Sequence, residues 1–303
     1  MKKSYNLLVI LCLLIFTVST NMFAQKKTAK NKTVKKDSAL LYEISGNGLE
    51  KPSYLYGTIH LICSNDMIPI EKFDQYISKT EQMYLELDLD DPNLTKRILA
   101  INSAKRDKTI ADYLTEEQLA KVNEMFMTYL GAPFDAIKQS HPFFLQQAVI
   151  TSPKSMGCTP PGSYDKSLME IAVKNKMEVR GLEEIQTQID AINSITIEKY
   201  AEDLYKLAED PETNFSQFRS MVDIYKTQNS EKLQEFVQGK MVENPAFQDT
   251  FLDKRNNSWI PVIEEQIKEK PTFIAVGAAH LNGKTGLITQ LKKKGYKLKS
   301  IRF

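Results

Sequence analysis

Several segments of this chain have the apolar pattern of β-strands. Leu40–Ile44 and Ser53–Ile59 are two such runs, and the loop between them contains the turn-forming Gly46-Asn47-Gly48, so together they predict a β-hairpin. Gln82–Leu89 alternates strictly, with leucines at 85, 87 and 89 on one face and acids at 86, 88 and 90 on the other. This alternation predicts a strand with an acidic face.

The middle of the chain follows the period of amphipathic helices instead. The predicted helices cover residues 93–103, 115–130, 141–151, 165–175, 183–194, 198–208, 215–227, 230–237 and 246–267. Pro261 predicts a kink or break in the last of these, and Val179–Leu182 is short and apolar enough for a buried strand between helices. The chain closes with strands at Thr272–Val276 and Tyr296–Arg302 around a helix at 284–294.

Strands at both ends and in the middle, separated by helices, predict an α/β fold. No stretch between residues 37 and 303 has the composition of a linker. We therefore expect a single domain over residues 37–303, with a central mixed β-sheet flanked by helices and a helix-rich middle segment.

The N-terminus has the composition of a secretory signal peptide over residues 1–24. Lys2 and Lys3 precede an apolar run too short to span a bilayer, and Ala24 supplies a small residue for cleavage. Met22 is bulky for such a site, so an uncleaved N-terminal anchor is the alternative. Residues 25–36 are Lys-rich with almost nothing apolar, which predicts a disordered tether. We expect an exported protein, periplasmic or extracellular, or tethered to the membrane.

Charge is unevenly distributed along the chain. Residues 1–36 hold eight lysines and no acids, so 32 basic and 38 acidic side chains remain and residues 37–303 carry a formal charge of −6. A mildly acidic body argues against a nucleic-acid partner. Membrane contact is expected only through the N-terminus, if it stays uncleaved.

Two cysteines remain after cleavage, Cys63 and Cys158. In an oxidising compartment an isolated pair of thiols is a candidate disulfide, and it would close a loop of about a hundred residues. Two unrelated free thiols, or two soft metal ligands, are the alternatives. Neither alternative has the local spacing of a Cys-x-x-Cys motif.

Two of the three histidines are the last residues of two similar sequence motifs. Gly57-Thr58-Ile59-His60 and Gly277-Ala278-Ala279-His280 each follow an apolar strand, with the histidine three residues after the glycine. Glycine at a strand end allows a sharp turn or a close approach, and ligands bind at such strand ends in open α/β sheets. Because 220 residues separate His60 from His280, they form one site only if the fold brings the two strand ends together.

Glu86 and Asp88, on the acidic face of a predicted strand, add carboxylates to this pair. Two imidazoles and a carboxylate with an open position are a common ligand set for a catalytic divalent metal. A core or surface role for each histidine, and an exposed strand face for Glu86, are the alternatives.

Several motifs occur in a fixed order along the chain: Gly57-Thr58-Ile59-His60-Leu61, Leu85-Glu86-Leu87-Asp88, Gly181-Leu182-Glu183 with Gln188, Asp253-Lys254-Arg255-Asn256 with Trp259, and Gly277-Ala278-Ala279-His280-Leu281 with Gly283 and Gly286. In this order they resemble the TraB/GumN family, which is related to the Tiki proteases. The resemblance covers residues 40–303. It implies metal-dependent cleavage of peptide bonds, with manganese or cobalt as the activating ion in Tiki-type members.

The resemblance also implies roles for single residues. His60 and His280 would bind the metal, and Glu86 would be a ligand or a general base acting on water. Arg255 would hold a substrate carboxylate or stabilise an oxyanion, with a helix-surface cation as the alternative. We therefore expect a divalent metal (Mn, Co or Zn) as cofactor and a peptide or protein as substrate.

Two other functions are compatible with the same residues. One is a non-catalytic protein that sequesters a peptide or small ligand, and the other is a metal-free hydrolase with His60 as general base. A dependence of activity on added metal would distinguish the metal-dependent hydrolase from these two alternatives. The variant His60→Ala would separate both enzymes from the binding protein.

Overall fold

The computed structural model describes residues 38–158, 161–241 and 248–303. The predicted signal peptide (1–24) and tether (25–36) lie outside these ranges. Within them, no helix combines the length and the apolar character needed to cross a membrane.

A six-stranded mixed sheet forms the centre of the fold, in the order β6-β4-β7-β2-β1-β8. Its strands are β1 (Leu41–Ser45), β2 (Ser53–Thr58), β4 (Gln82–Leu85), β6 (Glu178–Gly181), β7 (Thr272–Gly277) and β8 (Lys297–Ile301). The four strands β6, β4, β7 and β2 run parallel, whereas β1 is antiparallel to both of its neighbours. The prediction of an α/β fold with a central mixed sheet is confirmed.

The β1–β2 hairpin and the two innermost parallel strands follow the sequence pattern closely. Gly46, Asn47 and Gly48 all have positive φ angles (76°, 50° and 84°), a conformation that glycine and asparagine adopt most readily. Every residue of β2 and of β7 is buried, as expected for parallel strands covered on both faces.

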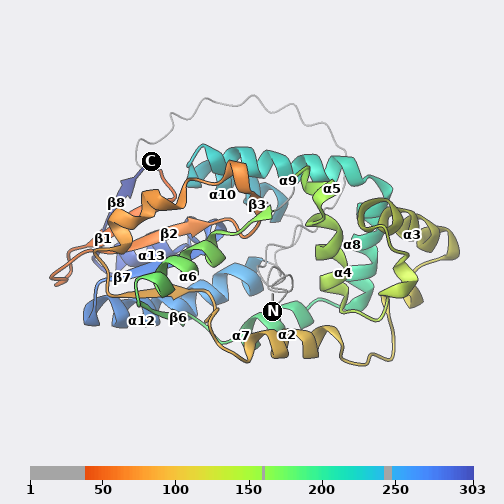
Figure 1. Ribbon diagram of the computed structural model, residues 1–303, viewed down its shortest axis with the longest axis horizontal. Helices are drawn as coiled ribbons and strands as arrows, with labels where there is room; N and C mark the ends of the chain where they lie inside the picture. The colour runs from red at the N-terminus through yellow and green to blue at the C-terminus, as the bar shows by residue number, and fades with distance from the viewer. Residues whose placement is uncertain (1–37, 159–160, 242–247) are drawn as a thin grey trace.

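Helices cover both faces of the sheet (Figure 1). One face packs against α1, α6, α9 and α10 through a core that includes Tyr56, Phe73 and Tyr164. The other face packs against α12 and α13 through a core built around Trp259 and Ile274. These helices are α1 (Asp74–Ile77), α6 (Tyr164–Lys174), α9 (Pro211–Lys226), α10 (Ser230–Met241), α12 (Lys254–Glu269) and α13 (Leu287–Lys293).

A helix-rich segment with its own core lies beside the sheet, at the right in Figure 1. It consists of α2 (Leu94–Asn102), α3 (Glu116–Leu130), α4 (Pro142–Ile150), α5 (Pro153–Met156), α7 (Ile185–Asn193) and α8 (Ile197–Glu209). Leu87 and Ala279, each two residues beyond the ends of β4 and β7, belong to this core. The helical segment therefore packs against the carboxyl ends of the parallel strands.

The predicted strand over Gln82–Leu89 is too long. β4 ends at Leu85, and Glu86 is the first residue beyond it. Two more backbone bonds, from Leu182 to Leu85 and from Glu183 to Glu86, join the chains that leave β4 and β6. The chain then turns toward the helical segment, where Leu87 packs. Alternating leucines and acids thus continue past the strand because the following turn also buries one side.

Two further expectations are wrong in detail. β6 is an edge strand with Glu178 and Arg180 exposed, rather than a buried strand. Of the kink or break predicted at Pro261, the break is wrong, because α12 continues through this residue. Pro261 is exposed, so water can satisfy the carbonyl that loses its helical partner. The irregular turn of this segment lies earlier, in a π-helix at Asp249–Asp253.

Candidate functional site

The sheet brings the two Gly-x-x-His motifs side by side. β2 and β7 are parallel neighbours, with Thr58 opposite Gly277, so both strands end at the same edge. His60 follows β2, and His280 ends a short 3-10 helix, Ala278–His280, that follows β7. β4 lies on the other side of β7 and places Glu86 at this edge as well.

Glu86 is the centre of the site. Its Oε1 lies 3.9 Å from Nε2 of His60 and 3.8 Å from Nε2 of His280. The same oxygen accepts a hydrogen bond from the backbone N–H of Gly277 at 2.7 Å. All three side chains are buried, with at most 7 % of each side chain exposed.

Neither motif glycine has room for a Cβ at ordinary contact distances. A Cβ on Gly277 would lie 3.2 Å from both Glu86 Oε1 and His60 Nε2, within the site itself. A Cβ on Gly57 would lie 2.6 Å from Cδ1 of Leu281, the residue that follows His280. Gly277 therefore leaves room for the polar groups, and Gly57 lets the second motif pack against the first.

The partners behind the two imidazoles set their tautomers. Nδ1 of His60 lies 3.1 Å from Oδ2 of Asp165, a carboxylate that can only accept, so Nδ1 carries the proton. Nδ1 of His280 lies 2.7 Å from Oδ1 of Asn256, and the amide of Asn256 donates to the backbone carbonyl of His280. In their neutral forms both rings therefore turn an unprotonated Nε2 toward Glu86.

Arg255 links the two buried carboxylates of the site. It donates a hydrogen bond from Nη2 to Oε2 of Glu86 at 2.6 Å, and it donates to Glu183 from Nε and Nη2. Its Nη1 donates to the carbonyl of Phe251 and lies 3.3 Å from Nε2 of His280. All five N–H groups of Arg255 thus have protein partners, and its guanidinium lies over the ring of Trp259.

These contacts fix the charge state of the centre. Burial alone would raise the pKa of Glu86, but the charge of Arg255 opposes it and the pKa is lowered to about 2. Burial lowers the pKa of His280 to about 3, where Glu86 opposes this shift and Arg255 adds to it. Burial also works against the charge of Arg255, but Glu86 and Glu183 raise its pKa. At neutral pH the centre therefore combines a carboxylate, a guanidinium and a neutral His280.

A family model described as the TraB/PrgY/gumN family matches residues 40–300. The chain belongs to the TraB/PrgY/gumN family. The matched region runs from β1 into β8 and includes every residue of the site. Searches of curated proteins and of solved structures found no match.

The site of this TraB/PrgY/gumN chain has nitrogen and oxygen donors of the kind that bind a divalent ion. Within residues 38–158, 161–241 and 248–303, no group of three His, Cys, Asp or Glu side chains is arranged to hold a metal ion. Two atoms that bind one ion at about 2.1 Å can lie at most about 4.2 Å apart, and the Nε2 to Oε1 distances meet this limit. The guanidinium of Arg255 is the feature that opposes a cation here.

Three supporting residues were not predicted as part of the site: Asp165, Asn256 and Glu183. Asp165 lies on the buried face of α6 with Leu168 and Ala172, a spacing of three and seven residues. An acid at a core-facing helical position was the signal available in the sequence. Asn256 and Glu183 lie within the family-like motifs, but the residues alone gave them no role.

His141 is separate from this site. It is the N-cap of α4, and its Nδ1 accepts a hydrogen bond from the backbone N–H of Phe143. Its Nε2 lies 3.1 Å from Oδ1 of Asn193. Burial lowers the pKa of His141 to about 4.

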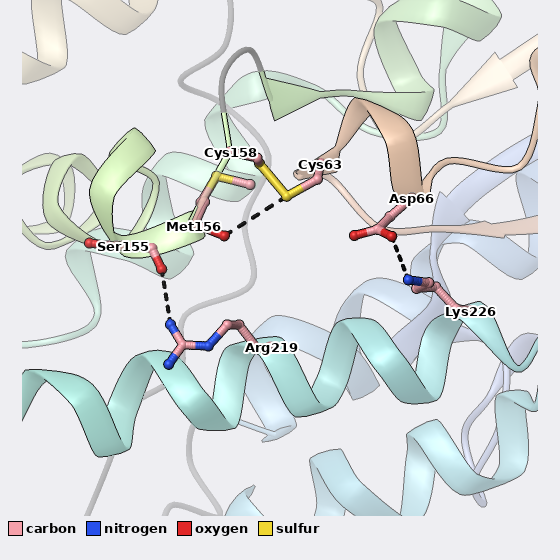
Figure 2. Close-up of a disulfide and its surroundings, with 7 residues drawn as sticks. All are labelled: Cys63, Asp66, Ser155, Met156, Cys158, Arg219 and Lys226. Atoms are coloured by element: carbon pink, nitrogen blue, oxygen red, sulfur yellow. Dashed lines mark hydrogen bonds and ion pairs between the residues drawn. A yellow bond between two sulfur atoms is a disulfide. The ribbon is translucent and has the colours of Figure 1, made fainter.

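A disulfide ties together the segments that follow His60 and precede Asp165 (Figure 2). Cys63 and Cys158 are joined across 95 residues, and Cys63 lies in β3 (Ile62–Cys63), which pairs with β5 (Pro161–Gly162). Figure 2 shows both segments lying over α9, whose Arg219 and Lys226 reach up to Ser155 and Asp66. The disulfide and this small sheet together hold the His60–Asp165 pair in place.

Proposed function

We propose that this protein is a metal-dependent hydrolase that cleaves peptide bonds. The observation that carries the proposal is the common orientation of His60 and His280, whose Nε2 atoms both face Oε1 of Glu86. Partners behind each ring, Asp165 and Asn256, are the arrangement expected for metal-binding histidines. The resemblance to the Tiki proteases supports a peptide as the substrate.

His60, His280 and Glu86 are the residues that would hold the ion. A divalent ion at this position would polarise a substrate carbonyl and lower the pKa of a water molecule. Asp165 and Asn256 keep the two imidazoles in the tautomer that leaves Nε2 available. Arg255 and the backbone N–H of Gly277 hold Glu86 in its anionic form.

Glu86 is better suited to holding an ion than to general-base catalysis. A general base is most effective when its pKa lies near the working pH. Both oxygens of Glu86 already accept hydrogen bonds, Oε1 from the backbone N–H of Gly277 and Oε2 from Arg255, which disfavours the uptake of a proton. The pKa of Glu86 is lowered in agreement with these contacts, since Arg255 outweighs part of the effect of burial. Between the two roles given by the family resemblance, we therefore propose that of ligand.

The His60–Asp165 pair favours metal-free hydrolysis as a second candidate. A carboxylate on Nδ1 stabilises the imidazolium that forms when Nε2 takes a proton from water or from a nucleophile. In this mechanism His60 is the general base, and the site needs no ion. The two candidates share His60 but differ in their need for His280 as a ligand.

We also propose that the protein works outside the cytoplasm. The Cys63–Cys158 disulfide supports this location, because disulfides persist in oxidising compartments. The signal-like composition of residues 1–24 supports it as well.

The test is a metal titration coupled to a cleavage assay. The full chain is stripped with chelator, then titrated with manganese, cobalt and zinc in a calorimeter, with His280→Ala and Glu86→Gln in parallel. We expect stoichiometric binding by the wild type, loss of binding in both variants, and cleavage of a peptide library that returns with the metal. Glu81→Gln is the matched control, because Glu81 is an exposed carboxylate that pairs with Lys51.

The outcomes separate the candidates. Cleavage by chelated protein that depends on His60 but not on added metal would replace the leading proposal with the metal-free mechanism. Binding of a peptide without cleavage, in a protein that retains its fold, would favour the sequestering function.

A further inference from the structure

A cavity adjoins the site on the side of His60. It lies between the segment after β2 and helices α4, α8 and α9, and has a volume of about 50 Å³. Ile59 and His60 line it, so one wall belongs to the Gly-x-x-His motif itself. By the space that one water needs, this volume accommodates roughly four water-sized groups, about the size of a short side chain.

Unpaired polar groups gather around this cavity. Five of its lining side chains have a buried nitrogen or oxygen without a hydrogen-bond partner: Gln146 Oε1, Gln147 Nε2, Asp203 Oδ2, Asn214 Oδ1 and Gln217 Oε1. Native proteins satisfy nearly all buried polar groups, so a cluster of this kind requires an explanation. The side chains belong to three different helices, which excludes a single irregular turn as the cause.

Four of the five unpaired atoms are oxygens that can only accept hydrogen bonds, and the other polar atoms of Asn214 and Asp203 already have partners. The amide nitrogen of Asn214 donates to the carbonyl of Asp210 at 2.7 Å, which leaves its Oδ1 as the unpaired atom. The other oxygen of Asp203 pairs with Lys199, so the charge of Asp203 is already compensated. Both side chains are at least nine-tenths buried. A guest must therefore donate hydrogen bonds, without a need for positive charge.

The other features of the cavity further restrict the chemical class of the ligand. Gln147 offers an unpaired donor, so the guest should also accept a hydrogen bond. Apolar walls that include Leu207 and Phe215 disfavour a charged group. A primary carboxamide meets all of these conditions, because it is neutral and combines two N–H donors with one carbonyl acceptor.

We propose that this cavity is a specificity subsite that takes the carboxamide side chain of an asparagine or glutamine in the substrate. This assignment rests on the proposed peptide hydrolysis, since the guest would be part of the peptide bound beside His60. Asn214 and Asp203 accept from the guest amide, and Gln147 donates to its carbonyl.

A cleavage assay tests the specificity. Peptides that differ at one position, with asparagine, glutamine, leucine, aspartate or lysine, are compared by kcat/KM with metal-loaded protein. We expect asparagine or glutamine to be preferred over leucine by at least about tenfold, because a site that bonds a polar group discriminates strongly against an analogue without it. Asn214→Leu should reduce this ratio about tenfold or more, and Gln217→Leu serves as a second variant should the first fail to fold. Gln75→Leu, at an exposed glutamine of α1, should retain the ratio.

A binding assay separates this inference from the proposed function. Propionamide, which has the size of a glutamine side chain, is tested by ligand-observed NMR against propylammonium and propionate. Propionamide binding that is lost in Asn214→Leu supports the subsite even if no peptide is cleaved. Cleavage with no asparagine or glutamine preference would leave the hydrolase in place and overturn the subsite. A preference for lysine and propylammonium, or a carboxamide preference that Asn214→Leu and Gln217→Leu both leave unchanged, would also overturn it.

Discussion

The carboxylate of Asp165 is the hydrogen-bond partner of His60, with 3.1 Å between Oδ2 and Nδ1. The corresponding partner of His280 is the neutral amide of Asn256, at 2.7 Å. A carboxylate stabilises positive charge on an imidazole, and an amide only orients it. The two histidines are therefore not equivalent: His60 is the one suited to accept a proton, whereas His280 stays neutral.

Asp165→Asn should reduce turnover about 10- to 100-fold, because His60 loses the charge that fixes its tautomer. Steady-state kinetics with wild type and variant would measure this, and thermal unfolding would show that the fold is intact. Asp223→Asn, at an exposed position of α9, is the control and should have wild-type kinetics. Equal kinetics for Asp165→Asn would show that His60 needs no charged partner.

The two motif glycines should respond differently to alanine. Gly277→Ala places a methyl group 3.2 Å from Glu86 Oε1 and His60 Nε2, so metal affinity should fall about tenfold or more with little loss of stability. Gly57→Ala collides with Leu281 and with the backbone of Ala278, so it should lower the free energy of unfolding by about 1–3 kcal/mol. Calorimetry and urea unfolding distinguish the two effects, and the same result for both variants would contradict these roles.

Arg255→Ala should destabilise the protein by about 3 kcal/mol or more at pH 7, because it leaves buried carboxylates on Glu86 and Glu183 unpaired. Without Arg255, the pKa of Glu86 should rise above its usual 4.5, because burial is the largest influence on this carboxyl and Arg255 is the largest that opposes it. A carboxylate with a raised pKa in the folded state loses stability as the pH rises, so the deficit should be smaller at pH 5 than at pH 7. Urea unfolding at both pH values measures this. Lys254→Ala, at an exposed neighbour, should change stability by less than about 0.5 kcal/mol, and a pH-independent deficit for Arg255→Ala would contradict the account.

His141 should make stability depend on pH between 6.5 and 4. Its pKa is lowered from 6.5 to about 4 in the folded protein, so in this range only the unfolded chain binds the proton. The free energy of unfolding should therefore decrease as the pH falls, by up to about 3 kcal/mol from this residue. His141→Asn keeps an N-cap acceptor but does not titrate, and should flatten the curve. An unchanged slope would assign the effect to other groups.

Reduction of the Cys63–Cys158 disulfide should lower the free energy of unfolding by about 4 kcal/mol, as expected for a loop closed across 95 residues. Turnover should fall as well, because the β3–β5 pairing that holds His60 near Asp165 loses its covalent tie. Unfolding and kinetics with and without reductant measure both effects. The double variant Cys63→Ala/Cys158→Ala should be insensitive to the reductant.

The sequence was sufficient to predict those parts of the fold that depend on the chemistry of neighbouring residues. The hairpin turn at Gly46-Asn47-Gly48 and the buried strands β2 and β7 follow from residue type and pattern alone. The pairing of β2 with β7 was posed only as a condition for a shared site, because hydrophobic pattern does not specify which buried strands become neighbours.

Other features depend on contacts that no local pattern encodes. Glu86 leaves the strand because the chains after β4 and β6 turn together, and the alternating leucines do not mark that point. The engagement of all five N–H groups of Arg255 results from the packing of α12 under the sheet edge, which sequence spacing could not reveal. The cap at His141 arises from a rare imidazole acceptor where serine is the usual choice.

The position of β7 between β4 and β2 has a consequence for biosynthesis. This central strand comes from residues 272–277, whereas both of its neighbours are made by residue 85. Until the ribosome has delivered β7, the edges of β2 and β4 have no partner strand between them, and His280 does not yet exist. A chain that has not reached His280 therefore has no complete centre, and the order of synthesis delays the assembly of the site until β7 and His280 have been made.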